Sequence, residues 1–153
     1  MRLRNVPGAD AYLTAHPLVI KNETRYRGTW KETFQNPENP IHIEIGMGKG
    51  QFLLTLAKEN PSINYIGIER YSSVLLRALE RFDNDEEYKD VNNIRFICMD
   101  ATNLPEVFAV GEIDKIYLNF SKIFPEQIFQ NMEIRRRGRQ KRKILFYFIT
   151  NKL

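Results

Sequence analysis

The chain has 153 residues, of which 42% are hydrophobic and 27% charged, and this suits one folded domain and excludes disorder throughout. The first residues lack the apolar core of a signal peptide, and no apolar run is long enough to span a membrane. The single cysteine, Cys98, excludes an internal disulfide, so a reducing, cytoplasmic location is the simplest expectation.

The net charge of +4 is unevenly distributed along the chain. Residues 122–153 carry nine Lys or Arg against two acidic residues, whereas residues 1–121 carry 14 basic and 17 acidic residues. We interpret residues 122–153 as a basic tail of uncertain structure. Such a tail either contacts nucleic acid or is merely a solvated or unnatural end.

Residues 1–40 form a polar N-terminal arm, whose four prolines argue against a long helix. Basic and aromatic side chains are interleaved along this arm: Arg2, Arg4, Tyr12, Lys21, Arg25, Tyr26, Arg27, Trp30, Lys31 and Phe34. The combination can bind RNA through phosphate contacts and base stacking. For Trp30 and Phe34, an equally good interpretation is that their rings dock the arm onto the domain.

A β-strand is predicted over residues 41–45, where three isoleucines alternate with polar residues. A turn with Gly46, Gly48 and Gly50 follows, and apolar residues then recur at helical spacing over residues 50–59. The glycines therefore lie between the end of a strand and the start of a helix, which is where open α/β sheets bind ligands. Glycine allows positive φ and close approach of a ligand to the backbone.

The spacing of this turn narrows the ligand class. Gly46-x-Gly48-x-Gly50 differs from the G-x-G-x-x-G of dinucleotide enzymes, and the chain lacks a phosphate-loop motif. Glu44 stands two positions before the first glycine, and a carboxylate there suits a cationic ligand better than a pyrophosphate. S-adenosylmethionine, a sulfonium that also carries an ammonium group, has the required charge. The alternative is a tight strand–helix turn that binds no ligand.

A second strand is predicted over residues 64–69. In a strand–helix–strand unit the second strand runs parallel to the first, so Glu69 reaches the same edge of the sheet as Gly46. A carboxylate about 20 residues after the glycine turn can accept hydrogen bonds from the hydroxyls of a ribose. The alternative is that Glu69 is an exposed loop acid.

A helix over residues 71–82, a solvated acidic loop over residues 83–90 and a third strand over residues 94–98 are predicted next. Asp100 follows the third strand and reaches the same edge. It can contact an adenine amino group or a ribose, and it can equally cap a turn or a helix.

After a short helical or irregular connection at residues 104–108, a fourth strand is predicted over residues 113–120, and it brings Asn119 to the same edge. The fold class is therefore α/β, with a Rossmann-like open parallel sheet and flanking helices built from residues 41–121. The apolar run 144–149 either pairs as a fifth strand or is an aggregation-prone segment.

Together these segments resemble the N-terminal part of the bacterial tRNA (guanine-N7)-methyltransferase family, a group of class I S-adenosylmethionine-dependent enzymes. The resemblance rests on residues 1–5, 43–50, 64–69 and 113–121, and it extends over most of the chain. It implies transfer of a methyl group from S-adenosylmethionine to N7 of a guanine in tRNA.

The resemblance also implies which residues bind the cofactor. Glu44 is expected by its methionine end, Glu69 at its ribose, and Asp100 with Ala101 at its adenine. Asn119 and the three turn glycines complete the expected site.

The motif-by-motif resemblance stops after Ser121. The family continues with Asp-Pro-Trp-Pro, whose aspartate is usually assigned to the active site, whereas this chain has Lys122, Ile123, Phe124 and Pro125. The catalytic residues of this chain are therefore unknown from its sequence. We infer an aberrant or truncated C-terminal part, produced by an internal deletion and a shifted reading frame, that leaves the sheet incomplete.

The missing aspartate leaves two main functional hypotheses open. The chain is a tRNA methyltransferase, of full or impaired activity, or a non-catalytic remnant that binds RNA or cofactor. A nucleotide-binding oxidoreductase is disfavoured by the glycine spacing and by Glu44. No metal is expected, because the only histidines, His16 and His42, form no ligand cluster, and His42 suits a packed position within its strand.

Overall fold

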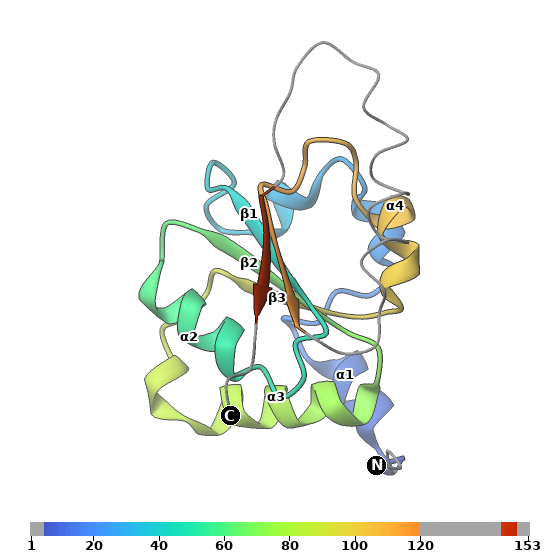
Figure 1. Cartoon of the computed structure of the whole chain (residues 1–153). Helices are drawn as coiled ribbons and strands as arrows, with labels where there is room; N and C mark the ends of the chain where they lie inside the picture. The colour runs from blue at the N-terminus through green and yellow to red at the C-terminus, as the bar shows by residue number, and fades with distance from the viewer. Residues whose placement is uncertain (1–4, 120–144, 150–153) are drawn as a thin grey trace.

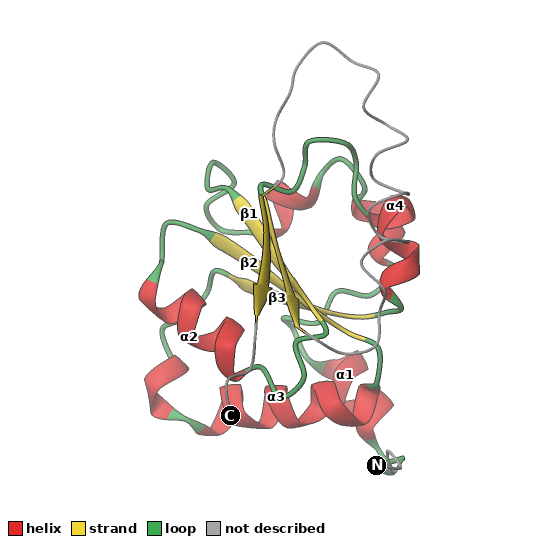
Figure 2. Ribbon diagram, in the orientation of Figure 1, coloured by secondary structure: helices red, strands yellow, loops and turns green. Residues whose placement is uncertain are grey.

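The computed structural model describes residues 5–119 and 145–149, which form a parallel sheet with helices on both faces (Figure 1). The five strands are β1 Ile41–Ile45, β2 Asn64–Glu69, β3 Ile94–Cys98, β4 Lys115–Asn119 and β5 Leu145–Ile149. The helices are α1 Ala9–Ala15, α2 Gln51–Glu59, α3 Ser72–Asn84 and α4 Leu104–Val107 (Figure 2). Short 3-10 turns lie at η1 Glu23–Tyr26, η2 Trp30–Thr33, η3 Glu86–Tyr88 and η4 Ala101–Asn103.

The strand order is β3-β2-β1-β4-β5, so β1 lies at the centre of the sheet. The chain builds outward from β1 through β2 to β3, and then returns to the other side of β1 with β4. Ile45 pairs with Ile68 of β2 and with Leu118 of β4, so the carboxyl ends of these three strands are level. The reversal of strand order between β1 and β4 is a topological switch point, the usual ligand position in such sheets.

Two apolar layers hold the sheet between its helices. Ile41, Ile43 and Ile45 belong to one buried cluster, which extends to the side chains of α4. The opposite face packs against α2 and α3, with Leu53 and Leu75 fully buried. Because successive strand residues point to opposite faces, the same alternation that buries the isoleucines directs His42 and Glu44 toward α2 and α3.

Most elements agree with the sequence prediction, with three differences. The fourth strand begins at Lys115 rather than at residue 113; just before it, Asp114 accepts the N–H of Ile41 through a carboxylate oxygen and donates its own N–H to the Ile41 carbonyl. The acidic loop 83–90 contains η3, and Tyr88 is buried rather than solvated. The sheet does not stop at its fourth strand, since β5 pairs with β4 in parallel and confirms the fifth-strand interpretation.

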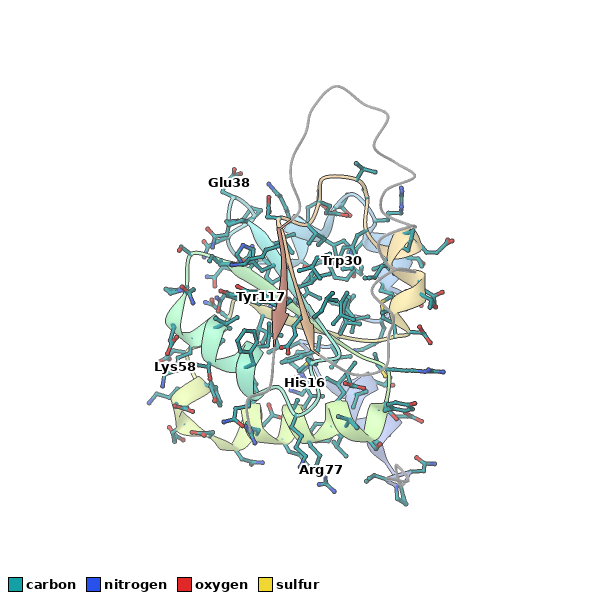
Figure 3. The ribbon with its side chains drawn as sticks, in the orientation of Figure 1. His16, Trp30, Glu38, Lys58, Arg77 and Tyr117 are labelled. Carbon is teal, nitrogen blue, oxygen red and sulfur yellow. The ribbon has the colours of Figure 1, made fainter. Side chains whose placement is uncertain are left out.

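The N-terminal arm is docked into the domain through Trp30 and Glu112. The indole of Trp30 is completely buried, lies between the sheet and α4 (Figure 3), and donates its N–H to the carbonyl of Val107 at 2.8 Å. The Glu112 carboxylate accepts the backbone N–H groups of Gly28, Trp30 and Ala109 at 3.0, 2.9 and 2.8 Å. The docking interpretation is confirmed for Trp30 and also for Phe34, which is buried in the same cluster.

The arm also covers the outer edge of the sheet beside β3. Ile20 donates its N–H to the carbonyl of Phe96, and Phe96 donates to the carbonyl of Leu18, both at 2.9 Å. The guanidinium of Arg95 donates to the carbonyl of Thr33, which holds a later part of the arm. An otherwise open strand edge is thereby paired, which removes a template for aggregation.

Among the described residues, α1 is the arm's only α-helix, and it packs against α3. His16, just after α1, lies with its Nε2 3.0 Å from a carboxylate oxygen of Asp83 at the end of α3, and Tyr12 donates its hydroxyl to the other oxygen. No helix within residues 5–119 has the length and apolar character needed to cross a membrane.

Replacement of Glu112 by Ala tests the docking of the arm. The change leaves three backbone N–H groups without their carboxylate acceptor, so we expect the free energy of unfolding to fall by about 2–4 kcal/mol. Glu106→Ala, at an exposed position of α4, is the matched control and is expected to stay within about 0.5 kcal/mol of the original chain. Urea denaturation followed by tryptophan fluorescence measures both. Equal stability of the two variants would contradict the role of this carboxylate as a clamp, that is, as the shared acceptor that joins the arm to the domain.

Candidate cofactor-binding site

The turn after β1 crosses over the end of β2. Gly46 and Met47 both donate their backbone N–H groups to the carbonyl of Ile68, at 2.9 and 3.1 Å. Gly46, Gly48 and Gly50 have φ values of 72°, 58° and 76°, in the left-handed region that favours glycine. The turn thus places a bare backbone at the carboxyl ends of β1 and β2, as its sequence predicts.

The glycines of the turn differ in what surrounds them. A Cβ on Gly50 would lie 3.0 Å from the Cβ of Ala78, because the start of α2 packs closely on α3. A Cβ on Gly48 would have no described atom within 4 Å. Gly48 therefore borders open space, while Gly50 serves the packing of two helices.

Glu69 ends β2 and joins two loops. One carboxylate oxygen accepts the N–H of Gly48 at 3.0 Å, and the other accepts the N–H of Tyr71 at 3.1 Å. The side chain is 8% exposed. Each oxygen can accept a second hydrogen bond, so Glu69 has capacity left for the two hydroxyls of a ribose.

Glu44 lies beneath the turn, and its side chain is completely buried. Neither carboxyl oxygen has a hydrogen-bond partner among the residues that the structure describes. Burial, followed by the negative charge of Glu69, raises the pKa of Glu44 to about 8. A buried carboxyl group without a partner costs stability, and such groups are concentrated where a ligand completes the structure.

Asp100 combines two interactions at the end of β3. One carboxylate oxygen accepts the backbone N–H and the hydroxyl of Thr102, at 3.0 and 2.9 Å, and these bonds, ahead of the charge of Arg70, lower its pKa. Asp100 therefore caps η4, which confirms the capping interpretation. The other oxygen lies 3.4 Å from the Nε of Arg70. The neighbouring Ala101 is 3% exposed and belongs to the core, so a contact between Ala101 and a ligand stays a prediction.

Asn119 is the last residue of β4, across the switch point from β1, and its backbone pairs in register with Ile149. Its expected role in the site stays a prediction. The segment around Lys122, where the family aspartate was expected and not found, lies outside the described residues. The basic tail is likewise outside them, except for β5.

His42 is a packed side chain, as predicted. Its ring contacts the rings of Tyr65 and Tyr117, with centroids 5.7 and 6.2 Å apart. Burial, and then the nearby charge of Lys115, lowers the pKa of His42. Within the described part of the chain, no group of three His, Cys, Asp or Glu residues is placed to hold a metal ion.

Two residues that the sequence analysis did not identify support the site. Tyr71 supplies the second N–H that holds Glu69, and its ring is 45% exposed at this edge of the sheet. Met47 is buried against Gly67, where a Cβ would lie only 2.3 Å from the sulfur of Met47. The sequence signal for this contact was Gly67 itself, because a glycine in the interior of a buried strand often marks the close approach of another group.

The arrangement suits a ligand with a cationic end and hydroxyl groups. Glu44 can compensate a positive charge at the centre of the sheet, and Glu69 can accept hydrogen bonds beside it. The bare backbone at Gly48 allows close approach. An all-parallel sheet with acidic residues and a glycine turn at its switch point defines a Rossmann-type nucleotide-binding domain.

Comparison with known families agrees with this class. Residues 38–139 match the family model Methyltransf_4, described as "Putative methyltransferase". The match covers more than half of the chain and continues past Ser121, where the motif-by-motif resemblance stops. The chain therefore belongs to this methyltransferase family.

Curated relatives named tRNA (guanine-N(7)-)-methyltransferase align with most of the chain. The protein of Lachnoclostridium phytofermentans is 52% identical over 126 residues, covering 82% of this chain and 56% of the relative. That of Bacillus subtilis is 43% identical over 128 residues, covering 83% and 58%. The resemblance drawn from the motifs is thus confirmed at the level of the family. The chain spans a little over half of the length of these relatives.

One solved structure, the antibiotic-resistance methyltransferase Kmr, overlaps 53% of this chain and 41% of that protein. Its TM-score is 0.45 at 23% sequence identity, a similarity too low to inform the site.

Replacing Gly50 or Gly48 by Ala, one at a time, distinguishes a glycine that helix packing requires from one that borders open space. Both changes force a left-handed backbone on alanine, which costs about 1–2 kcal/mol. Gly50→Ala also brings a methyl group against Ala78, so we expect it to lose at least about 1 kcal/mol more stability than Gly48→Ala. Thermal or urea unfolding measures both variants. An equal loss would show that α2 and α3 do not pack this closely.

Glu44 predicts a pH dependence of stability. Its pKa is about 8 in the folded chain, against 4.5 for the ordinary carboxyl group. The folded state therefore binds the Glu44 proton more tightly than the unfolded state does. The resulting stabilisation of the folded state is complete below about pH 4.5 and is lost as the pH rises to 8. The full loss is about 4–5 kcal/mol.

Glu44→Gln keeps the shape of the protonated side chain and removes the titration. We expect the free energy of unfolding of the original chain to decrease relative to this variant between pH 5 and pH 8. The titration of His42, whose lowered pKa acts in the opposite direction, is common to both proteins and cancels in the comparison. Urea titrations at several pH values measure the difference, and parallel pH profiles would contradict it.

Proposed function

We propose that this chain acts in a tRNA (guanine-N7)-methyltransferase, which transfers a methyl group from S-adenosylmethionine to N7 of a guanine in tRNA. Membership of a methyltransferase family and relatives with this printed name support the proposal. The cytoplasmic location expected from the composition fits a tRNA substrate and stays a prediction.

The observation that carries the proposal is the buried Glu44 carboxyl group, without a partner in the described structure, beneath the glycine turn. A dinucleotide would place a pyrophosphate over this turn and repel an acidic residue. S-adenosylmethionine instead brings an ammonium and a sulfonium group. In the proposed site Glu44 compensates positive charge, Glu69 holds the ribose, and Gly48 allows the close approach.

The chemistry requires little from the protein beyond alignment. The bound cofactor supplies an electrophilic methyl group on sulfur. Guanine N7 carries an in-plane lone pair and needs no deprotonation, so the protein acts by holding N7 in line with that methyl group and by its electrostatics. The described residues that serve this alignment lie at the carboxyl ends of β1 and β2.

The basic side chains of the arm provide a surface for the tRNA. Lys21, Arg25, Arg27 and Lys31 are all exposed, whereas Trp30 and Phe34 are buried. We therefore assign phosphate contacts to the arm and withdraw base stacking from these two aromatic rings. The alternative function, a remnant that binds RNA or cofactor without catalysis, is favoured by Lys122 in place of the family aspartate.

Calorimetric titration with S-adenosylhomocysteine, the product form of the cofactor, tests the cofactor site. We expect saturable binding that becomes about 10 to 100 times weaker in Glu69→Ala, because charge-assisted hydrogen bonds are lost and the Gly48 and Tyr71 loops are released. Glu80→Ala, on the outer side of α3, is the control and keeps the original affinity. Absence of binding by the original chain would overturn the proposal.

Transfer of a radiolabelled methyl group to unmodified tRNA distinguishes the two functions. Formation of 7-methylguanosine supports the enzyme. Cofactor binding together with salt-sensitive tRNA binding, but without transfer, supports the non-catalytic remnant.

A further inference from the structure

Glu44 combines complete burial with the absence of a hydrogen-bond partner in the described part of the chain. An ionised carboxylate in such surroundings is strongly disfavoured, because neither water nor a donor compensates its charge. Its neighbour in the site is a second acid, Glu69, which adds repulsion. Both costs are avoided in the free chain when the Glu44 carboxyl group carries a proton.

The hydrogen bonds distinguish the two carboxyl groups. Glu69 accepts N–H groups at both of its oxygens. Glu44 has no described donor. The proton therefore belongs to Glu44 in the free chain.

The other titratable groups around Glu44 do not change this assignment. On its own strand, His42 points to the same face, where its ring contacts those of Tyr65 and Tyr117 and its Nδ1 is buried without a hydrogen-bond partner among the described residues. Tyr117 of β4 pairs with Glu44 in register, and Lys115 lies 5.0 Å from the Tyr117 ring. Gly67, the β2 residue in register, carries no side chain. The pKa of Glu44 is raised by burial and then by the negative charge of Glu69, with no opposing effect from Lys115.

We propose that cofactor binding is coupled to release of a proton from Glu44, so that this buried residue makes the site sensitive to pH. This inference rests on the proposed function and adds its regulation. Arrival of an ammonium group next to Glu44 favours the carboxylate, and the carboxyl proton passes to the solvent. The site thereby binds the cofactor more tightly as the pH rises through the neutral range.

Calorimetry in two buffers with different heats of ionisation counts the protons directly. S-adenosylhomocysteine is the probe, and 5′-methylthioadenosine is the control ligand, since it keeps the adenosine and the sulfur but lacks the ammonium group. At pH 7 we expect nearly one proton released per S-adenosylhomocysteine bound and none per methylthioadenosine bound. Glu44→Gln should bind S-adenosylhomocysteine without this release.

The pH profile gives an independent measurement. The original chain and Glu44→Gln should have similar affinities near pH 6, where both side chains are neutral. Their affinity ratio should then increase by about tenfold to hundredfold up to pH 8.5, in favour of the original chain. Ionisation of the ligand itself is common to both proteins and cancels in this ratio.

The possible results separate the inference from the proposed function. Binding of S-adenosylhomocysteine with equal proton release in the two proteins, or with a constant affinity ratio, would overturn the coupling and leave the cofactor site intact. Failure of the original chain to bind either adenosine compound would overturn both. Proton release that disappears in Glu44→Gln establishes the coupling.

Discussion

The Glu44 carboxyl group, enclosed under the glycine turn at the centre of the sheet, is the constraint around which this structure is arranged. A polar group buried without a hydrogen bond costs about 1–3 kcal/mol, and a charge there costs more. The surrounding fold must therefore hold β1 firmly. It does so with β2 and β4 on either side of β1 and apolar layers above and below, so an unfavourable group is held in place.

The Glu69 carboxylate is held in one orientation within the candidate site. Its two oxygens hold Gly48 and Tyr71, which belong to different loops, and these bonds orient the carboxylate before any ligand arrives. An acceptor that is already oriented loses little conformational entropy on binding. The same two contacts keep the glycine turn at a defined distance from the start of α3, so the geometry of the site depends on one side chain from β2.

Local patterns were sufficient to predict the sheet and the edge of it at which the candidate site residues meet. The alternating isoleucines, the glycine spacing and the acid at the end of β2 each depend on neighbouring residues, and all three indicated the carboxyl ends of β1 and β2. Contacts between residues far apart in the chain could not be predicted from these local patterns. The Glu112 clamp joins residues more than 80 positions apart, and the choice of Asp100 as a cap required the position of Thr102. Pairing of β5 depended on a partner strand that its own sequence does not specify.

The contact between Trp30 and Val107 joins residues 77 positions apart in the chain. During synthesis at about 5–20 residues per second, the indole leaves the ribosome roughly 4–15 s before its acceptor. For that interval the ring lacks the Val107 carbonyl and the Phe108 ring as partners, although β1 and β2 can already pair. The order of synthesis thus separates an early, central half-sheet from a late closing step. A nascent chain arrested before residue 107 would present this ring to chaperones.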